Sequence, residues 1–158
     1  WRGERDLNSA AVGIEIVNGG HDFGLPDYPA VQIEAVCDLI SELMERHGLG
    51  PECVIGHSDV AADRKEDPGE HFPWRVLEER GLAVRLTGET PSTAIQDDLE
   101  RAGYNPEAAL PDTVRAFQRR HRPNRVDGQV DDETSALIWK ISFEIKFPST
   151  SKIGIFRD

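Results

Sequence analysis

The chain has 158 residues, of which 38% are hydrophobic and 30% are charged, a composition typical of globular proteins. Its net charge of −11 argues against nucleic acid as the main partner, because phosphate binding requires a basic surface. No apolar run approaches the ~20 residues needed to cross a bilayer, so we expect no transmembrane segment. The chain begins at Trp1 and its only methionine is Met44, so we expect that residues preceded Trp1 at translation.

The first predicted strand covers residues 11–17, where β-branched side chains alternate with other types. The apolar residues Val12, Ile14 and Ile16 share one face of this strand. Glu15 lies on the other face, and a lone acid there has two interpretations. Either the strand lies at the edge of its sheet with Glu15 in water, or the carboxylate points into a functional pocket.

A helix is predicted next, beginning at Pro29 and ending at Gly48, because its apolar residues recur at helical spacing. A short buried strand over residues 53–55 follows. It delivers His57 at its C-terminal end, where α/β proteins commonly keep their chemistry.

The two cysteines, Cys37 and Cys53, are too few for a disulfide scaffold and do not form a metal-binding pattern. We interpret them as buried apolar side chains, with a single disulfide between them as the alternative. Beyond them, Phe72-Pro73-Trp74 is predicted to begin a short helix that ends at Gly81, and residues 84–86 are predicted to form a last strand.

The remaining half of the chain predicts three short helices. Ser92 can cap the first, Pro111 begins the second, and either Asp131 or Asp132 caps the third. Helices of this length with a small shared core, in which we place Phe117, are typical of a compact binding module.

The predicted elements divide the chain into four parts. Residues 1–86 alternate strands and helices and are predicted to form an α/β domain. Residues 87–91 form a linker, and residues 92–141 form the three-helix domain. Residues 142–158 form a tail of alternating apolar residues around a Pro-Ser-Thr-Ser turn, either an added strand or a disordered end, and we assign it no function.

One loop carries a cluster of chemically useful side chains. His57, Lys65 and Asp67 lie within ten positions, in a stretch bounded by glycine and proline. Imidazole and carboxylate are good zinc ligands, and an ammonium group can stabilise an oxyanion. The spacing alone is a weak zinc signal, and a charged surface loop is the commoner explanation.

Several motifs occur together in a known order. The first half contains, in this order, Leu7-Asn8, Val12-Gly13-Ile14-Glu15-Ile16, Gly56-His57-Ser58-Asp59, Arg64-Lys65-Glu66-Asp67-Pro68-Gly69 and Phe72-Pro73-Trp74. It resembles the zinc-dependent N-acetylmuramoyl-L-alanine amidases of the AmpD/AmiD type, which are related to the peptidoglycan recognition proteins. The second half resembles the helical peptidoglycan-binding domain that often follows such amidases, through Gly103-Tyr104, Ala116-Phe117-Gln118-Arg119-Arg120, Val126-Asp127-Gly128 and Asp132-Glu133-Thr134.

The resemblance implies a fold with a mixed β-sheet and a reaction, cleavage of the amide between N-acetylmuramic acid and L-alanine. It implies Zn²⁺ as cofactor, with His57 and Asp67 as ligands. Glu15 matches the catalytic glutamate that moves the water proton, and Lys65 matches the catalytic lysine that stabilises the tetrahedral intermediate. The family's first zinc histidine ends a strand that would lie upstream of Trp1, so we expect an amidase domain without its N-terminal part.

Some residues keep two interpretations. His21, in the loop after the first strand, is interpreted as an exposed or substrate-binding residue, with a role as third zinc ligand as the alternative. Trp74 could contact substrate, because aromatic rings stack on sugars, although packing of its helix is favoured. The basic cluster around His121 is interpreted as a solvated helix face, with binding of peptidoglycan carboxylates as the alternative; it contains Arg119, Arg120, Arg122 and Arg125.

The sequence therefore predicts a peptidoglycan amidase whose partner is peptidoglycan or a muropeptide. The alternatives are a non-catalytic peptidoglycan-binding protein, or an inactive chain that lacks the first zinc histidine. The appended module favours the bacterial cell envelope, specifically the periplasm, over the cytoplasm.

Overall fold

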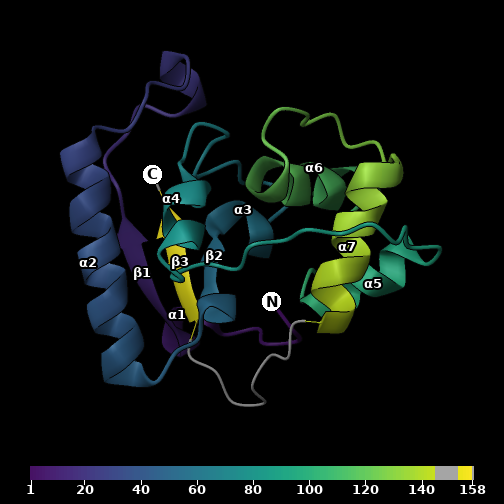
Figure 1. The fold of residues 1–158 in the computed structure, drawn as a ribbon, viewed down its shortest axis with the longest axis horizontal. Helices are drawn as coiled ribbons and strands as arrows, with labels where there is room; N and C mark the ends of the chain where they lie inside the picture. Colours follow the sequence, from purple (N-terminus) through teal and green to yellow (C-terminus); the bar gives the residue numbers. More distant parts are fainter. Residues whose placement is uncertain (145–152, 158) are drawn as a thin grey trace. The chain divides into compact units, whose positions relative to one another are not determined.

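A computed structural model describes residues 1–144 and 153–157 of the chain (Figure 1). The described residues form two compact units, each made of separate stretches of sequence. We call residues 6–56, 67–85 and 153–157 the sheet unit, and residues 1–5, 57–66 and 86–144 the helical unit. The predicted division at residues 86, 91 and 141 follows the sequence only and stays a prediction.

The sheet unit is built on three parallel strands, β1 (Ala11–Glu15), β2 (Val54–Gly56) and β3 (Ile153–Arg157). Their order is β1-β3-β2, and Gly13 of β1 and Ile55 of β2 both lie opposite Ile155. The C-terminal strand is therefore the link between two strands that do not pair with each other. The α/β class is confirmed, but the described strands are all parallel, whereas a mixed sheet was expected.

Helix α2 (Ala30–His47) packs its apolar stripe against this sheet (Figure 1). It ends where predicted, because Gly48 takes the left-handed conformation with φ of 64°, which favours glycine. The shorter elements are α1 (Leu7–Ala10), two 3₁₀ turns (His21–Phe23 and Pro51–Cys53) and α4 (Trp74–Glu79). The shared core draws on β1, β2, α2 and α4 and includes Ile14, Ile16, Ile33, Val36, Cys37, Ile40, Val54, Phe72, Trp74 and Leu77.

Several predictions about the sheet unit can be compared with this fold. The alternation along the first strand is confirmed, since Ile14 and Ile16 are buried while Glu15 is exposed on an edge strand of the sheet. Cys37 and Cys53 are both buried free thiols. The strand expected over residues 84–86 is wrong, because this stretch has no regular secondary structure and pairs with none of the described strands. The part of the predicted tail over residues 145–152 lies outside the described residues.

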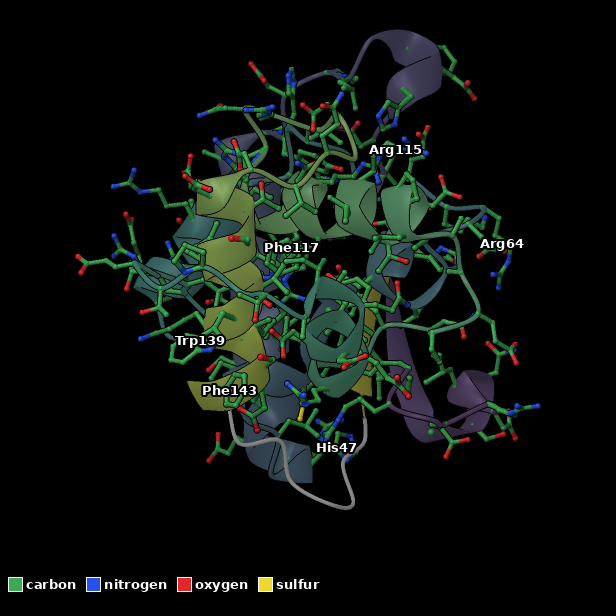
Figure 2. All side chains as sticks on the ribbon, turned by 90° about the vertical axis from the view of Figure 1, so that its right-hand side faces the viewer. His47, Arg64, Arg115, Phe117, Trp139 and Phe143 are labelled. Carbon is green, nitrogen blue, oxygen red and sulfur yellow. The ribbon has the colours of Figure 1, made fainter. Side chains whose placement is uncertain are left out.

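The helical unit contains α3 (His57–Val60), α5 (Ile95–Ala102), α6 (Leu110–His121) and α7 (Asp132–Glu144). Phe117 of α6 is fully buried, as expected, and Figure 2 shows it beneath that helix. Ser92 lies three residues before α5, accepts the N–H of Ala94 at 3.0 Å and donates to Asp98. Among the described helices of the whole chain, none is long and apolar enough to cross a membrane.

A buried amide closes the loop between α6 and α7. The Gln118 side chain accepts the N–H groups of Asp127 and Gly128 at 3.0 and 2.8 Å, and donates to the carbonyl of Gln129 at 2.9 Å. Gly128 has φ of 74°, and a Cβ there would lie 2.7 Å from the carbonyl oxygen of Pro111. The Val-Asp-Gly motif therefore forms part of this loop, and position 128 requires glycine because a side chain there would be strained and would clash with Pro111.

The solvated-face interpretation is wrong for Arg119, Arg120 and His121 of α6, whereas Arg125 beyond the helix is exposed as expected. Arg119 and Arg120 are only 4% and 6% exposed. His121 is half-buried, and both ring nitrogens are shielded from solvent with no hydrogen-bond partner among the described residues. Burial, and then the nearby charge of Arg120, lower the pKa of His121 well below its ordinary value. Helical spacing could not predict the burial of Arg119 and Arg120, because their acidic partners, Glu66 and Asp59, come from a distant segment of the chain.

We expect deletion of residues 153–158 to loosen the sheet unit selectively. Without β3, the backbone groups of β1 and β2 lose the partner that both strands share. Amide hydrogen exchange in β1 and β2 should become at least about tenfold faster. The amides of α6 and α7 serve as internal controls and should keep their rates. Unchanged exchange in β1 would contradict the strand order.

We also expect Asp131→Ala to destabilise the helical unit. Asp131, rather than Asp132, caps α7, because its Oδ1 accepts the N–H of Thr134 at 2.8 Å. Its carboxylate also pairs with Arg122 and Arg125 at 2.6 and 2.7 Å. Loss of the cap should lower the free energy of unfolding by about 1 kcal/mol, measured by urea denaturation. Asp132→Ala is the matched control and should change little.

This effect should depend on pH. The hydrogen bond from Arg122, followed by that from the Thr134 N–H, holds the pKa of Asp131 well below its usual range. The backbone N–H of Gln129, followed by Arg125, lowers the pKa of Asp127 to about 2. A lowered folded-state pKa contributes stability above the unfolded-state value of about 3.9, and this is lost as the pH falls. The gap between wild type and Asp131→Ala should therefore narrow below about pH 4.

Candidate functional site

Two of the predicted site residues, Glu15 and His57, lie at the carboxyl ends of parallel strands. Glu15 is the last residue of β1, and its side chain is exposed. Gly56 ends β2, and the next residue in the chain is His57. Glu15 lies opposite Arg157 and Gly56 lies opposite Phe156 in the register, so both strands end at the same edge of the sheet. This edge is where α/β proteins commonly place their functional groups.

The segment from His57 to Glu66 is a series of short turns. Helix α3 makes one turn, in which the N–H of Ala61 donates to the carbonyl of His57 at 3.0 Å. The N–H of Lys65 donates in turn to the carbonyl of Ala61 at 2.9 Å, and its side chain is exposed. This chain of backbone bonds relates the positions of His57 and Lys65 within the helical unit, and we call residues 57–66 the catalytic segment after these two predicted site residues.

Asp67 is half-buried and begins the stretch of the sheet unit that follows the catalytic segment. The loop that carries His21 packs against the residues just after Asp67. His21 Nε2 lies 2.8 Å from Glu70 Oε2. A Cβ on Gly69 would lie 2.4 Å from Leu25 and 3.4 Å from the His21 ring, so the two loops touch through the bare backbone of Gly69. The structure thus brings His21 next to the segment that begins with Asp67.

Trp74 lies in the core of the sheet unit. Its side chain is 5% exposed, and its ring meets Phe72 edge-on at 4.9 Å. This burial fits the packing role, and contact of Trp74 with substrate stays a prediction. Trp1, in the helical unit, is also buried, with its ring 5.0 Å from that of Tyr104.

The zinc-ligating groups do not amount to a complete site in the described part of the chain. No group of three or more His, Cys, Asp or Glu side chains among these residues is placed to hold a metal ion. A catalytic zinc usually takes three protein ligands and keeps one position for water. The two expected donors, His57 and Asp67, are one short of that number, so the described residues do not by themselves fit a catalytic zinc.

Sequence analysis missed the group that anchors the catalytic segment. Asp59 stands in the quoted Gly-His-Ser-Asp motif, but nothing in the sequence indicates its partners, Tyr104 and Arg120, which lie 45 and 61 positions away. Burial, and then the negative charge of Asp59, raise the pKa of Tyr104 well above its ordinary value. Glu70 was missed as well, because nothing in the sequence indicates that it pairs with the distant His21.

Two stretches of the chain match different protein families. Residues 1–70 match the family model of N-acetylmuramoyl-L-alanine amidase, and residues 91–138 match the model of a peptidoglycan binding domain. The N-acetylmuramoyl-L-alanine amidase AmiD of Escherichia coli strain K12 is 32% identical over 162 residues, which cover 87% of this chain and 58% of AmiD.

Two solved structures share the fold. AmpDh3 from Pseudomonas aeruginosa is 31% identical with a TM-score of 0.69, covering 75% of this chain and 55% of AmpDh3. AmiD from E. coli, in complex with the substrate anhydro-N-acetylmuramic acid-L-Ala-D-γ-Glu-L-Lys, is 28% identical with a TM-score of 0.65, covering 73% of this chain and 52% of that protein. The chain therefore spans little more than half the length of the proteins it resembles.

We expect the purified chain to retain well below one zinc ion per molecule after dialysis, because its described donors are one short of a catalytic set. Elemental analysis measures this directly. A value near one would show that a third ligand is present, and His21→Ala should then lower it. His47→Ala replaces a histidine at the far end of α2 and is the matched control.

Proposed function

We propose that this chain, a homologue of AmiD with an N-acetylmuramoyl-L-alanine amidase segment and a peptidoglycan binding segment, acts in hydrolysis of the amide between N-acetylmuramic acid and L-alanine. One observation carries the proposal. Four groups suited to amide hydrolysis, Glu15, His57, Lys65 and Asp67, occur in the family's order in a chain that aligns with AmiD over 87% of its length. A protein that only binds the wall has no need of this set.

The roles of two residues follow from their chemistry. Glu15 is an exposed carboxylate at the carboxyl edge of the sheet, so it can accept a proton from the attacking water and pass it to the leaving amine. Lys65 is an exposed ammonium in the catalytic segment, so it can stabilise the negative charge that develops on the carbonyl oxygen. His57 and Asp67 are the proposed zinc ligands, and a catalytic zinc usually takes a third protein ligand.

The substrate class follows from the relatives. AmiD is solved with an anhydro-N-acetylmuramic acid tripeptide, so we assign this chain a muropeptide or the same linkage in intact peptidoglycan. The peptidoglycan binding segment over residues 91–138 favours the polymer, and therefore action in the bacterial cell envelope, specifically the periplasm. His21, beside the segment that begins with Asp67, is the proposed substrate contact.

The second candidate is a peptidoglycan-binding protein without catalysis, and the incomplete donor set favours it. The two candidates differ in what they require of Lys65. Wall binding does not need the Lys65 ammonium, whereas amide hydrolysis does.

We expect Lys65→Ala to lower the rate of muropeptide cleavage by at least about 10²-fold, as loss of an oxyanion-stabilising group does in other hydrolases. Co-sedimentation with purified peptidoglycan should be unchanged. Arg64→Ala is the matched control, because it removes an adjacent exposed cation and should leave both measurements intact. Cleavage that survives Lys65→Ala would contradict the assigned role, and zinc-supplemented wild type that binds but never cleaves would support the second candidate.

A further inference from the structure

The catalytic segment belongs to the helical unit rather than to the sheet unit, although it lies within the stretch that matches the amidase family. Helix α3 packs against α6, which lies within the peptidoglycan binding segment. Two hydrogen bonds from the peptidoglycan binding segment meet at Asp59 of α3.

Asp59 is a fully buried carboxylate with a separate donor for each oxygen. Its Oδ1 accepts the hydroxyl of Tyr104 at 2.7 Å, and its Oδ2 accepts Nη1 of Arg120 at 2.9 Å. The Asp59 side chain is 0% exposed and that of Arg120 is 6% exposed. A charge removed from water in this way must be paired and hydrogen-bonded. The two donors therefore define both the position and the orientation of the Asp59 carboxylate.

The position of Asp59 also determines the positions of the residues around it. Asp59 lies in the single turn of α3, two residues after His57, and Lys65 is tied to the same turn through the backbone of Ala61. An isolated helix of four residues is not stable in water, so this turn depends on tertiary contacts. Its partners in the helical unit come from α6 and from the residues just after α5.

A second contact lies at the other end of the segment. Arg119, beside Arg120 on α6, donates to Glu66 at 3.3 Å. Glu66 is 61% exposed, and exposed ion pairs contribute little. Asp59 is therefore the main anchor, and Glu66 is an additional contact beyond Lys65.

The packing around Tyr104 holds its hydroxyl in place. The ring meets those of Trp1 and Phe117 edge-on. A Cβ on Gly103 would lie 2.7 Å from Trp1, and Gly103 has φ of 123°, so the Gly-Tyr pair lets Trp1 lie against this turn. The backbone N–H of Arg2 donates to the carbonyl of Gly103 at 2.7 Å and completes the contact.

We propose that the helical, peptidoglycan-binding part of the chain also positions the catalytic segment, with Tyr104 and Arg120 as positioning residues that act on His57 and Lys65 through Asp59. The chemical roles of His57 and Lys65 rest on the proposed function, but the positioning does not. The three-helix module is thus a structural part of the hydrolytic site as well as a binding module. Its removal disorders the catalytic segment even if the sheet unit stays folded.

The test compares variants of the whole 158-residue chain by amide hydrogen exchange. Tyr104→Phe removes one donor and keeps the ring, and Arg120→Met removes the charge and keeps the length. Both should speed exchange in residues 57–66 at least about tenfold relative to α7, and Arg120→Lys should restore part of the protection. The matched control is Arg115→Met, because Arg115 lies on the same helix but pairs with Asp112 of that helix (Figure 2).

Arg120→Met leaves Asp59 buried without its charged partner and can prevent folding. The double variant Asp59→Asn with Arg120→Met removes both charges, so it keeps the test possible, and exchange in the catalytic segment should still exceed that of wild type. The proposal would be overturned if the Tyr104→Phe variant and the double variant both fold and the amides of residues 57–66 exchange at the wild-type rate in both.

Kinetics separates this proposal from the proposed function. In Tyr104→Phe, kcat for muropeptide cleavage should fall at least about fivefold with KM nearly unchanged, because the segment carries catalytic groups. Wild type that shows no cleavage counts against the proposed function alone, since the exchange measurement still tests positioning. Cleavage with an unchanged kcat in a variant whose segment exchanges faster would show that the contacts are structural only, and would overturn the positioning role.

Discussion

The buried carboxylate of Asp59 is the constraint on which the helical unit depends. It has no access to water, and its charge is balanced by Arg120 while Tyr104 donates to its other oxygen. Removal of one partner of such a pair typically costs about 3–5 kcal/mol, because the other charge is left buried. These contacts join a turn beside His57 to a helix more than 60 positions later. A module that resembles a separate wall-binding domain in sequence therefore packs against the segment that carries the proposed site residues His57 and Lys65.

The sheet unit has a comparable dependence on a distant segment. β1, which ends at Glu15, and β2, which directly precedes His57, pair with β3 and not with each other. In each unit, a residue of the proposed site thus lies on an element whose partners come from far downstream, because Glu15 ends β1 and His57 begins α3.

Local patterns predicted the elements whose stability depends on nearby residues. The apolar stripe and Gly48 predicted α2, and alternation predicted the exposed Glu15 between buried Ile14 and Ile16. The motif around His57 led to the amidase resemblance, which the comparisons confirm. The strand expected at residues 84–86 failed because short apolar runs form strands only when a partner strand is available. The solvated-face interpretation of α6 failed because Arg119 and Arg120 meet acids from the catalytic segment.

The sequence by itself determined the α/β class, the extent of the main helices and the order of the candidate catalytic groups, since these depend on spacing, turn residues and side-chain chemistry along the chain. Only the tertiary structure decided that Asp59 and Arg120 form a buried pair, that His21 meets Glu70, and that the C-terminal strand lies between β1 and β2. The reason is physical: a buried charge or an unpaired strand needs a partner, but its own sequence does not specify which distant segment supplies that partner.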